Sequence, residues 1–263
     1  MCIRDRVNTL IGTKGVGLTS GYLYPGATYP YGMVQFTPSY FSKRSGFVIN
    51  QLSGGGCEHI GNFPTFPVKG KLKMSPDNIL NYRINISEEK GHAGYYEAKV
   101  QEDIHAKLTV TERTGMASYE YPADQQYGTV IIGGGISATP IEQAAIVITA
   151  PNKCEGYAEG GNFCGLRTPY KVYFVAEFDT DALESGTWKR DELKPNTTFA
   201  EGEYSGVYFT FDVNKKKNIQ YKIGVSYVSV ENARENLKAE NTGWDFLQIQ
   251  NQAESKWNHY LGK

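Results

Sequence analysis

An alternating stretch near the C-terminal end decides the fold class: Ile219-Gln220-Tyr221-Lys222-Ile223-Gly224-Val225-Ser226-Tyr227. Every second residue in it is apolar, which is the pattern of a β-strand that buries one face. The same period of two recurs earlier, in segments that carry Ala106, Leu108 and Val110; Val172, Phe174, Ala176 and Phe178; and Val207, Phe209 and Phe211. Because turn residues separate these segments and no helical pattern lies between them, we predict a mainly β fold, a large antiparallel β-sandwich.

Three other segments carry less regular patterns. Residues 31–36 predict a short strand. Pro64 and Pro67 mark their segment as a sheet edge or an irregular connection, because proline cannot donate a hydrogen bond to a neighbouring strand. Residues 153–167 are rich in glycine, and we predict a long loop there.

The pattern changes to that of helices after residue 228. Ser229 is a helix-capping residue with Glu231 in the turn that follows, and Thr242 offers a second cap. An apolar stripe at helical spacing then runs to the C-terminus and comprises Phe246, Ile249, Ala253, Trp257 and Leu261. The stripe either packs on the sandwich or begins a further helical domain. We favour the second interpretation, and we expect an exposed stripe to make the chain self-associate or bind hydrophobic dye.

The composition limits the classes of function. The chain has 263 residues, 40% hydrophobic and 21% charged, as expected of a soluble globular protein. Its net charge of -1 gives no electrostatic reason to expect nucleic acid or an anionic membrane as a partner. No apolar run approaches the roughly 18 residues of a membrane span. The cysteines form no C-x-x-C pair, and the spacing of Cys154 and Cys164 permits, without requiring, a disulfide across a hairpin.

The most unusual local feature is a glycine-rich run, Ser53-Gly54-Gly55-Gly56-Cys57-Glu58. Three consecutive glycines fit neither a strand nor a helix, because glycine loses the most backbone freedom on ordering. The run suits a tight loop that brings bare backbone N–H groups close to another group. It is either a turn at the end of the sandwich or one wall of a binding site.

Several stretches resemble glycoside hydrolase family 92, the calcium-dependent exo-α-mannosidases. Val7–Thr13 is similar to the family's opening VNPFIGT, and Tyr24–Gln35 is similar to its FPGATxPFGMVQ. Further matches, in family order, are Gln51–Cys57, Gly94–Tyr96, Thr111–Gly115, Gly224–Ala233 and Gly243–Phe246. Each motif alone is weak, but together they are specific and span nearly the whole chain. Gln51 stands where the family usually has histidine, which puts in question any contact made by that imidazole.

The resemblance implies a division of labour within a longer protein. It implies a galactose-mutarotase-like supersandwich at residues 7–228, linker helices at residues 229–263, and then a catalytic α/α-barrel that this chain lacks. The family's catalytic acid, catalytic base and calcium ligands belong to the barrel. We therefore expect no catalytic residue and no metal site here, and an inactive fragment. Residues 1–6 lack the apolar core of a signal peptide and are unlike the strand-forming sequence that follows, so we expect a non-native or disordered start.

The resemblance also implies partners and a location. The substrates are α-mannosides or the mannose of N-glycans, and the protein partner is the C-terminal α/α-barrel of the same protein. We expect neither nucleic acid nor a membrane span. The family resemblance favours a secreted or periplasmic location in a bacterium, although no signal peptide is visible.

The same resemblance makes the glycine-rich run one wall of a mannose subsite. The residues that we predict to bind substrate are Ser53, Gly54, Gly55, Gly56, Cys57, Glu58 and Asn62. Backbone N–H groups would donate to hydroxyl groups, the small Cys57 thiol would leave room for a ring, and Glu58 would accept hydrogen bonds. His59 is either a further polar contact or a structural histidine.

Other polar and aromatic residues receive structural interpretations. Glu112 is predicted to be a surface carboxylate beside Arg113. Trp244 and Trp257 are predicted to pack against the fold rather than to stack on a sugar. Two other classes of function remain open: a stand-alone carbohydrate-binding module, and a purely structural or interaction domain.

Overall fold

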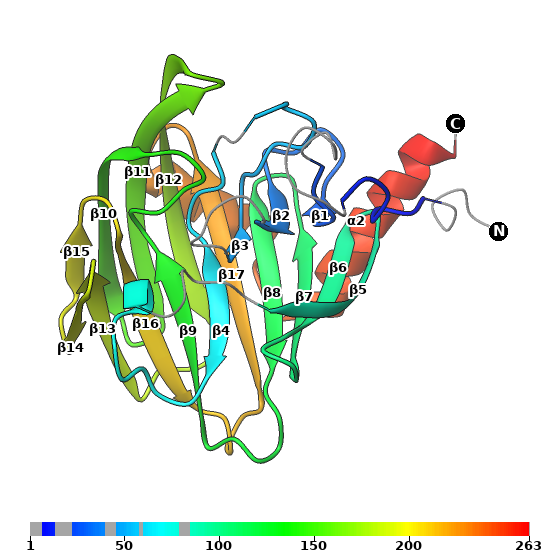
Figure 1. The fold of residues 1–263 in the computed structure, drawn as a ribbon. Coiled ribbons are helices and arrows are strands. Elements are labelled where there is room, and N and C mark those ends of the chain that lie inside the picture. Colours follow the sequence, from blue (N-terminus) through cyan, green and yellow to red (C-terminus); the bar gives the residue numbers. More distant parts are fainter. Residues whose placement is uncertain (1–6, 14–22, 40–45, 58–59, 79–84, 263) are drawn as a thin grey trace.

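The computed structural model describes residues 7–13, 23–39, 46–57, 60–78 and 85–262. Two antiparallel sheets lie face to face, and two helices follow at the C-terminal end of the chain (Figure 1). This arrangement confirms the predicted antiparallel β-sandwich. Residues 1–6, Glu58 and His59, for which we made predictions, lie outside the described residues.

Within the described residues, the two sheets contain eight and nine strands. The first sheet, in spatial order, comprises β1 (Ala27–Thr28), β2 (Gln35–Pro38), β3 (Phe47–Val48), β4 (Thr65–Lys69), β9 (Tyr127–Gly133), β16 (Ser205–Asp212), β13 (Glu184–Lys189) and β14 (Glu192–Pro195). The second comprises β15 (Phe199–Glu201), β10 (Ile141–Ala150), β11 (Lys153–Phe163), β12 (Leu166–Phe178), β17 (Asn218–Ser226), β8 (Thr114–Glu120), β7 (Ile104–Val110), β6 (Tyr95–Val100) and β5 (Ile86–His92). The helices are α1 (Val230–Glu240) and α2 (Phe246–Leu261), with a short 3-10 helix at Pro76–Asn78.

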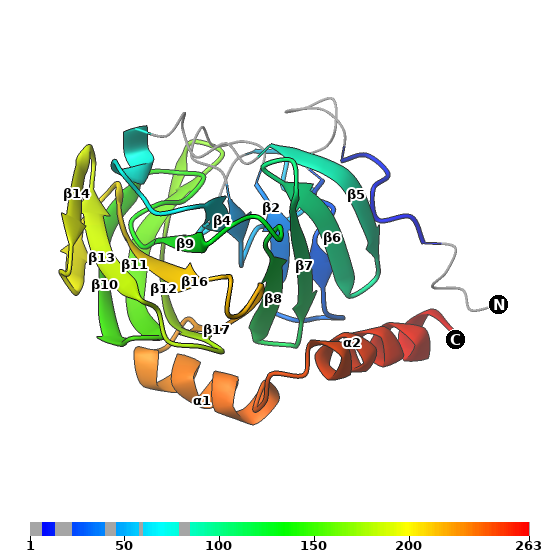
Figure 2. The same ribbon diagram turned by 90° about the horizontal axis from the view of Figure 1, so that it is seen from below.

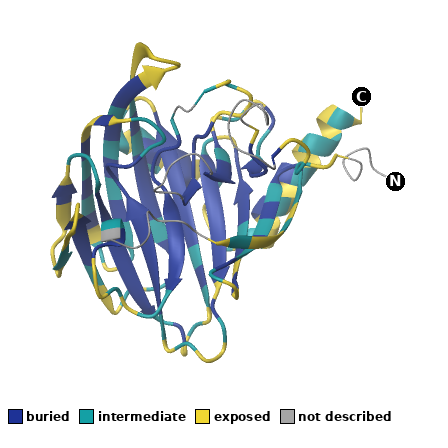
Figure 3. Ribbon diagram, viewed as in Figure 1, coloured by how far each residue is buried: buried dark blue, intermediate teal, exposed yellow. Residues whose placement is uncertain are grey.

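The core lies between the two sheets, where the inward side chains of the strands are buried (Figure 3). The apolar residues of the alternating stretch on β17 are all buried, except that Tyr227 lies past the strand and is 43% exposed. Aromatic contacts join the sheets. The ring centroid of Phe178 on β12 lies 5.0 Å from that of Phe209 and 5.1 Å from that of Phe211, both on β16.

Among the fully enclosed tyrosines of this core are Tyr119, Tyr121 and Tyr221, and we call these three the buried tyrosines. Burial raises the pKa of each phenol above its ordinary value, because a phenolate would lose its hydration. The folded state therefore holds these protons more tightly than the unfolded chain does.

Helix α1 packs on the outer face of the nine-stranded sheet, which buries β17 on both faces. Ser229 caps its N-terminus as predicted, and the Ser229 side chain accepts a hydrogen bond from the backbone N–H of Asn232 at 3.1 Å. Gly224 makes the close approach possible. A Cβ at this position would lie 2.6 Å from the carbonyl oxygen of Ala233 and 2.8 Å from the Cβ of Leu237.

Helix α2 lies under the other half of the same sheet, against β6, β7 and β8 (Figure 2). Its N-cap is Asp245 and not the predicted Thr242, because the Asp245 side chain accepts from the backbone N–H of Gln248. The apolar stripe faces the sheet, where Ile249 is 5% exposed and Ala253 is fully buried. The expectation of an exposed stripe is therefore wrong, because the domain's own sheet buries Ile249 and Ala253 and half-buries the other three stripe residues. Self-association and dye binding stay predictions.

Gly94 and Trp257 are among the residues that hold α2 against the sandwich. Gly94, in the turn between β5 and β6, has a φ of +87°, and a Cβ there would lie 2.9 Å from the Cβ of Ala253. The indole Nε1 of Trp257 donates a hydrogen bond to the carbonyl oxygen of Thr28 at 2.7 Å. Neither helix of the described chain is long and apolar enough to cross a bilayer.

The loop predicted at residues 153–167 is instead strand β11 and the tip of its hairpin with β12. The glycines that suggested a loop instead allow neighbouring strands to approach closely, because they have no side chain. A Cβ at Gly156 would lie 2.1 Å from the carbonyl oxygen of Ala145 on β10. Glycine is therefore the residue that lets these two strands pair here.

Two other strand predictions need correction. The strand expected at residues 31–36 begins only at Gln35, because Tyr31 lies in a turn with a φ of +59°. The segment with two prolines contains β4, which is an interior strand of its sheet and not an edge. The proline at position 67 is tolerated because β3, the neighbour on one side, pairs with β4 only at Thr65.

Candidate functional site

The glycine-rich loop, residues 53–57, connects β3 to β4 at one end of the sandwich. Gly54 and Gly56 both have a φ of +76°, a conformation that glycine adopts without strain. Ser53 and both of these glycines are exposed. The loop therefore presents backbone groups to the surroundings, and two of its three glycines are required by its conformation.

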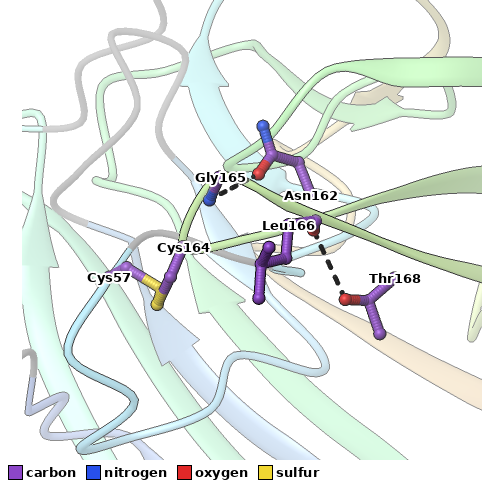
Figure 4. Close-up of a disulfide and its surroundings, with 6 residues drawn as sticks. All are labelled: Cys57, Asn162, Cys164, Gly165, Leu166 and Thr168. Carbon is purple, nitrogen blue, oxygen red and sulfur yellow. Dashed lines mark hydrogen bonds between the residues drawn. A yellow bond between two sulfur atoms is a disulfide. The ribbon is translucent and has the colours of Figure 1, made fainter.

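Both ends of this loop are fastened to the rest of the domain. The hydroxyl oxygen of Ser53 accepts hydrogen bonds from the backbone N–H of Tyr24 at 3.3 Å and from Nε2 of Gln35 at 2.6 Å. At the other end, Cys57 forms a disulfide with Cys164 at the tip of the β11–β12 hairpin (Figure 4). The loop is thus exposed and yet held on two sides.

The disulfide corrects two expectations. Cys154 is not the partner of Cys164, because its side chain faces the core from β11 whereas Cys164 lies at the hairpin tip. Burial raises the pKa of the unpaired Cys154 thiol, so the thiol stays protonated and unreactive. Cys57 is also not the free thiol expected beside a sugar ring, because its sulfur is bonded to that of Cys164.

Asn62 lies just beyond the loop and is fully buried. Its backbone N–H donates to Oδ1 of Asn50 at 2.7 Å. Its own Oδ1 accepts from Nδ2 of Asn50 and from the hydroxyl of Tyr170, each at 3.0 Å. Asn62 therefore joins the loop segment to strand β12, and its side chain is not presented to solvent.

Beside the loop is a pocket of about 310 Å³ that we call the hairpin pocket. Three parts of the chain form it: Leu52 and Ile60, which flank the glycine-rich loop and which we call the glycine-loop segment; both arms of the β11–β12 hairpin; and Tyr227 at the end of β17. Its apolar and aromatic walls are Leu52, Ile60, Phe163, Pro169, Tyr170 and Tyr227. The sequence analysis missed this pocket, because its walls come from segments far apart in the chain.

The two tyrosines of the hairpin pocket have their hydroxyl groups engaged behind the wall. Tyr170 donates to Asn62, and the hydroxyl of Tyr227 accepts from Nδ2 of Asn50 at 3.4 Å. Burial raises the pKa of both phenols. Tyr227 was the residue whose sequence pattern could have indicated this pocket. It continues the apolar alternation of β17 but lies one residue past the end of that strand.

A profile of the Glycosyl hydrolase family 92 N-terminal domain matches residues 6–226 of the chain. The chain belongs to this family. Its N-terminal domain is the part that the chain represents, and the resemblance found in the motifs is confirmed.

Relatives of this family-92 domain are longer than the chain. An "Uncharacterized secreted glycosidase" of the fungus Arthroderma benhamiae is 25% identical over 97% of the chain, which spans 37% of that protein. A family-92 α-mannosidase from Bacteroides thetaiotaomicron is 24% identical, with a TM-score of 0.84, over 100% of this chain and 38% of its own. A family-92 inverting mannosidase from the same bacterium is 23% identical, with a TM-score of 0.81, over 99% of this chain and 36% of its own. Both structures show a shared fold.

Two carboxylates of the family-92 domain, Glu155 and Glu177, are occupied in ion pairs. Glu155 accepts from Arg234 of α1 at 2.7 Å. Glu177 lies 3.0 Å from the ammonium of Lys153 and 3.6 Å from that of Lys222. These pairs fasten the sheet to α1 and to its own neighbouring strands, which is a structural role.

A further carboxylate, Glu240, was missed by the sequence analysis. It lies in the last turn of α1, where the helix dipole disfavours a negative charge. Its Oε2 accepts from the hydroxyl of Thr111 at 2.6 Å and from the backbone N–H of Arg113 at 2.8 Å, and its Oε1 pairs with the Arg113 guanidinium. The Thr111–Gly115 motif thus anchors the end of α1, while Glu112 is exposed, as predicted.

The tryptophans of the family-92 domain also have structural partners. Trp188 is fully buried. Trp244 lies under the ammonium of Lys222, 4.4 Å from the ring centroid, and Trp257 is hydrogen-bonded to β1. The packing predicted for Trp244 and Trp257 is what the structure shows.

Proposed function

We propose that this family-92 domain is the N-terminal part of an inverting exo-α-mannosidase. In this proposal the domain packs on a catalytic α/α-barrel and contributes the glycine-rich loop to the mannose-binding site. The observation that carries the proposal is the loop itself, which is exposed and yet fixed by Ser53 at one end and by the disulfide of Cys57 at the other. A fixed loop loses little conformational freedom when it donates backbone hydrogen bonds to a sugar.

The roles that we propose for the predicted residues follow from their positions. Ser53, Gly54, Gly55 and Gly56 line the subsite through their backbone groups. Cys57 holds the loop to the hairpin. Asn62 acts from behind, because its buried side chain positions the loop segment and Tyr170. Glu58, outside the described residues, keeps its proposed role as an acceptor of sugar hydroxyl groups.

The proposal places the chemistry in the other domain. Inversion requires two carboxyl groups on opposite sides of the sugar, far enough apart to admit a water molecule. Glu155 and Glu177 are both held in ion pairs. Calcium prefers six to eight oxygen ligands, and no group of three His, Cys, Asp or Glu side chains that could hold a metal ion occurs within the described ranges. The residues described here do not fit the ion, so we propose that the barrel holds it.

The disulfide supports a proposed location outside the cytoplasm. Disulfides persist in secreted and periplasmic proteins, where the surroundings are oxidising. The fungal relative is named as a secreted glycosidase. We propose that the mannosidase containing this domain is exported.

Hydrolysis of an aryl α-mannoside tests the division of labour. The purified chain should show no turnover with calcium or with a chelator, and calcium-dependent turnover would place the catalytic groups within these residues. Calorimetry with mannose then separates the alternatives, because measurable affinity of the chain alone would favour a stand-alone carbohydrate-binding module.

Substitutions in the longer enzyme test the loop. We expect Ser53→Ala and Asn62→Ala to lower kcat/KM by about tenfold or more, because each loosens a loop that must meet the sugar in one geometry. The matched control is Glu112→Ala, an exposed residue whose loss should leave kcat/KM unchanged. Unchanged kinetics in all three variants would favour a purely structural domain.

A further inference from the structure

We propose that the hairpin pocket is a docking socket for an apolar side chain of the segment that follows this domain in the longer protein. The inference rests on the proposed function only in taking the chain to be one domain of a longer protein. The relatives support that starting point, because the matched span is 37% of the curated glycosidase and 38% of the solved α-mannosidase. A larger part of each relative therefore lies outside this span.

The socket is formed before any partner arrives. Its walls come from the glycine-loop segment, the β11–β12 hairpin and the end of β17, and the Cys57–Cys164 disulfide joins the first two (Figure 4). The hydrogen bond from Tyr170 to Asn62 fixes the hairpin to the loop segment a second time. A pocket fixed in this way gains affinity because little ordering remains to be done on binding.

The polar side chains that line the socket each make a hydrogen bond within the domain, which limits what the socket can accept. The hydroxyl groups of Tyr170 and Tyr227 are hydrogen-bonded behind the wall. The hydroxyl of Thr168 donates to the carbonyl oxygen of Leu166, and Oδ1 of Asn162 accepts from the N–H of Gly165 (Figure 4). A sugar ring that entered would bury hydroxyl groups with few partners, which is costly. An apolar side chain pays no such cost, so the socket favours one over a sugar.

The surroundings of the socket favour a protein partner over a small ligand. Three apolar wall residues are exposed: Leu52 50%, Phe163 38% and Tyr227 43%. Leu166, which pairs with Phe163 across the hairpin, is 71% exposed, and Val228, which follows Tyr227 in the chain, is 74% exposed. An exposed apolar patch that extends beyond a pocket is typical of a protein contact surface. The apolar stripe of α2 does not compete for this role, because the domain's own sheet covers it.

Thiol labelling of two protein lengths tests the inference. The background is Cys2→Ser, which leaves Cys154 buried and the other two cysteines in the disulfide. Leu166→Cys, beside Phe163 of the wall, or Val228→Cys, beside Tyr227 of the wall, then places one reactive thiol next to the socket, and we call these the rim thiols. We expect labelling of each at least tenfold slower in the longer protein than in the 263-residue chain. The control is Leu183→Cys, 53% exposed in the β12–β13 connection, which should react equally in both.

Several outcomes would overturn the inference. Equal labelling of the rim thiols in both proteins would show that nothing in the longer protein covers the socket. Protection already present in the shorter chain, and lost on dilution, would assign the socket to a second copy. A gene that ends at Lys263 would remove the proposed occupant altogether.

The mannoside assay on the same proteins keeps the two proposals apart. If the longer protein hydrolyses the aryl mannoside while its rim thiols react freely, the socket proposal is contradicted and the proposed function is supported. A longer protein with protected rim thiols and no mannosidase activity would support the socket and count against the function.

Discussion

We expect the double substitution Cys57→Ser with Cys164→Ser to destabilise the domain by about 3–5 kcal/mol. The disulfide joins residues that are 107 positions apart in sequence. In the chain-entropy description, opening a ring of that length frees the unfolded chain by about 5 kcal/mol at 25 °C. Residual structure in the unfolded state lowers the measured value. Because a domain has only about 5–15 kcal/mol of stability in total, the variant should fold with a reduced margin.

Urea unfolding, followed by tryptophan fluorescence, measures this loss. Reductant should lower the transition midpoint of the wild type toward that of the double variant. It should leave the double variant itself unchanged, because Cys154 is buried and unpaired. A loss below about 3 kcal/mol would refute the reasoning, because it would fall short of the lower end of the expected range.

A local readout tests the same bond independently of total stability. Hydrogen exchange in the double variant should increase most at residues 160–168 and 53–57, which the disulfide ties together. The β17 amides, buried in the sheet on both faces, should keep their relative protection. An increase spread evenly over the domain would mean that the bond acts only on global stability and does not hold the hairpin in place.

Three further predictions use the same unfolding assay. The buried tyrosines keep their protons above pH 10 in the folded state, whereas the unfolded chain releases them, so stability should fall as pH rises above about 10, by at most about 4 kcal/mol per pH unit. Glu240→Gln removes the negative charge of the carboxylate that accepts hydrogen bonds from Thr111 and Arg113, and should lower the free energy of unfolding by about 1–3 kcal/mol. Gly94→Ala adds a Cβ 2.9 Å from that of Ala253, at a φ of +87°, and should cost about 2 kcal/mol or more.

Each of these predictions has a contrary outcome. Burial lowers the pKa of Lys222 in the folded state. This group alone would make stability increase with pH until the pKa of an unfolded lysine is reached. The opposite effect of the three buried tyrosines is larger, because three groups contribute to it. A flat or rising stability above pH 10 would therefore contradict the first. Glu112→Gln, in the same turn, should be nearly neutral. The control for Gly94→Ala is Gly70→Ala, because Gly70 has a φ of +74° but a Cβ there would meet no atom within 4 Å. An equal loss of stability in the two variants would show that the contact with α2 contributes nothing.

Strand positions were predictable where local pattern and burial agree. The alternation from Ile219 to Val225 and the cap at Ser229 were both confirmed, because each depends on neighbours within a few residues. The glycines of β11 misled the prediction, since a glycine in a loop and a glycine beneath a neighbouring strand look alike in sequence. Only the contact between Gly156 and Ala145 distinguishes them.

The candidate site was predictable in part. The glycine-rich run marked a loop that needs positive φ angles, and Gly54 and Gly56 have them. The burial of Asn62 and the hairpin pocket did not follow from the sequence, because both depend on Tyr170, which lies 108 residues from Asn62. Spacing along a chain carries no information about which distant strands become neighbours.

The sequence by itself determined the class of this protein: an antiparallel sandwich, two C-terminal helices, and the motifs of family 92. These properties depend on side-chain periodicity, capping residues and short motifs, all of which are local. The tertiary structure alone decided that Cys57 pairs with Cys164, that the sheet covers the α2 stripe, and that an apolar pocket lies beside the glycine-rich loop. Each of these depends on which residues, distant in the chain, are brought together when the two sheets bury their shared core.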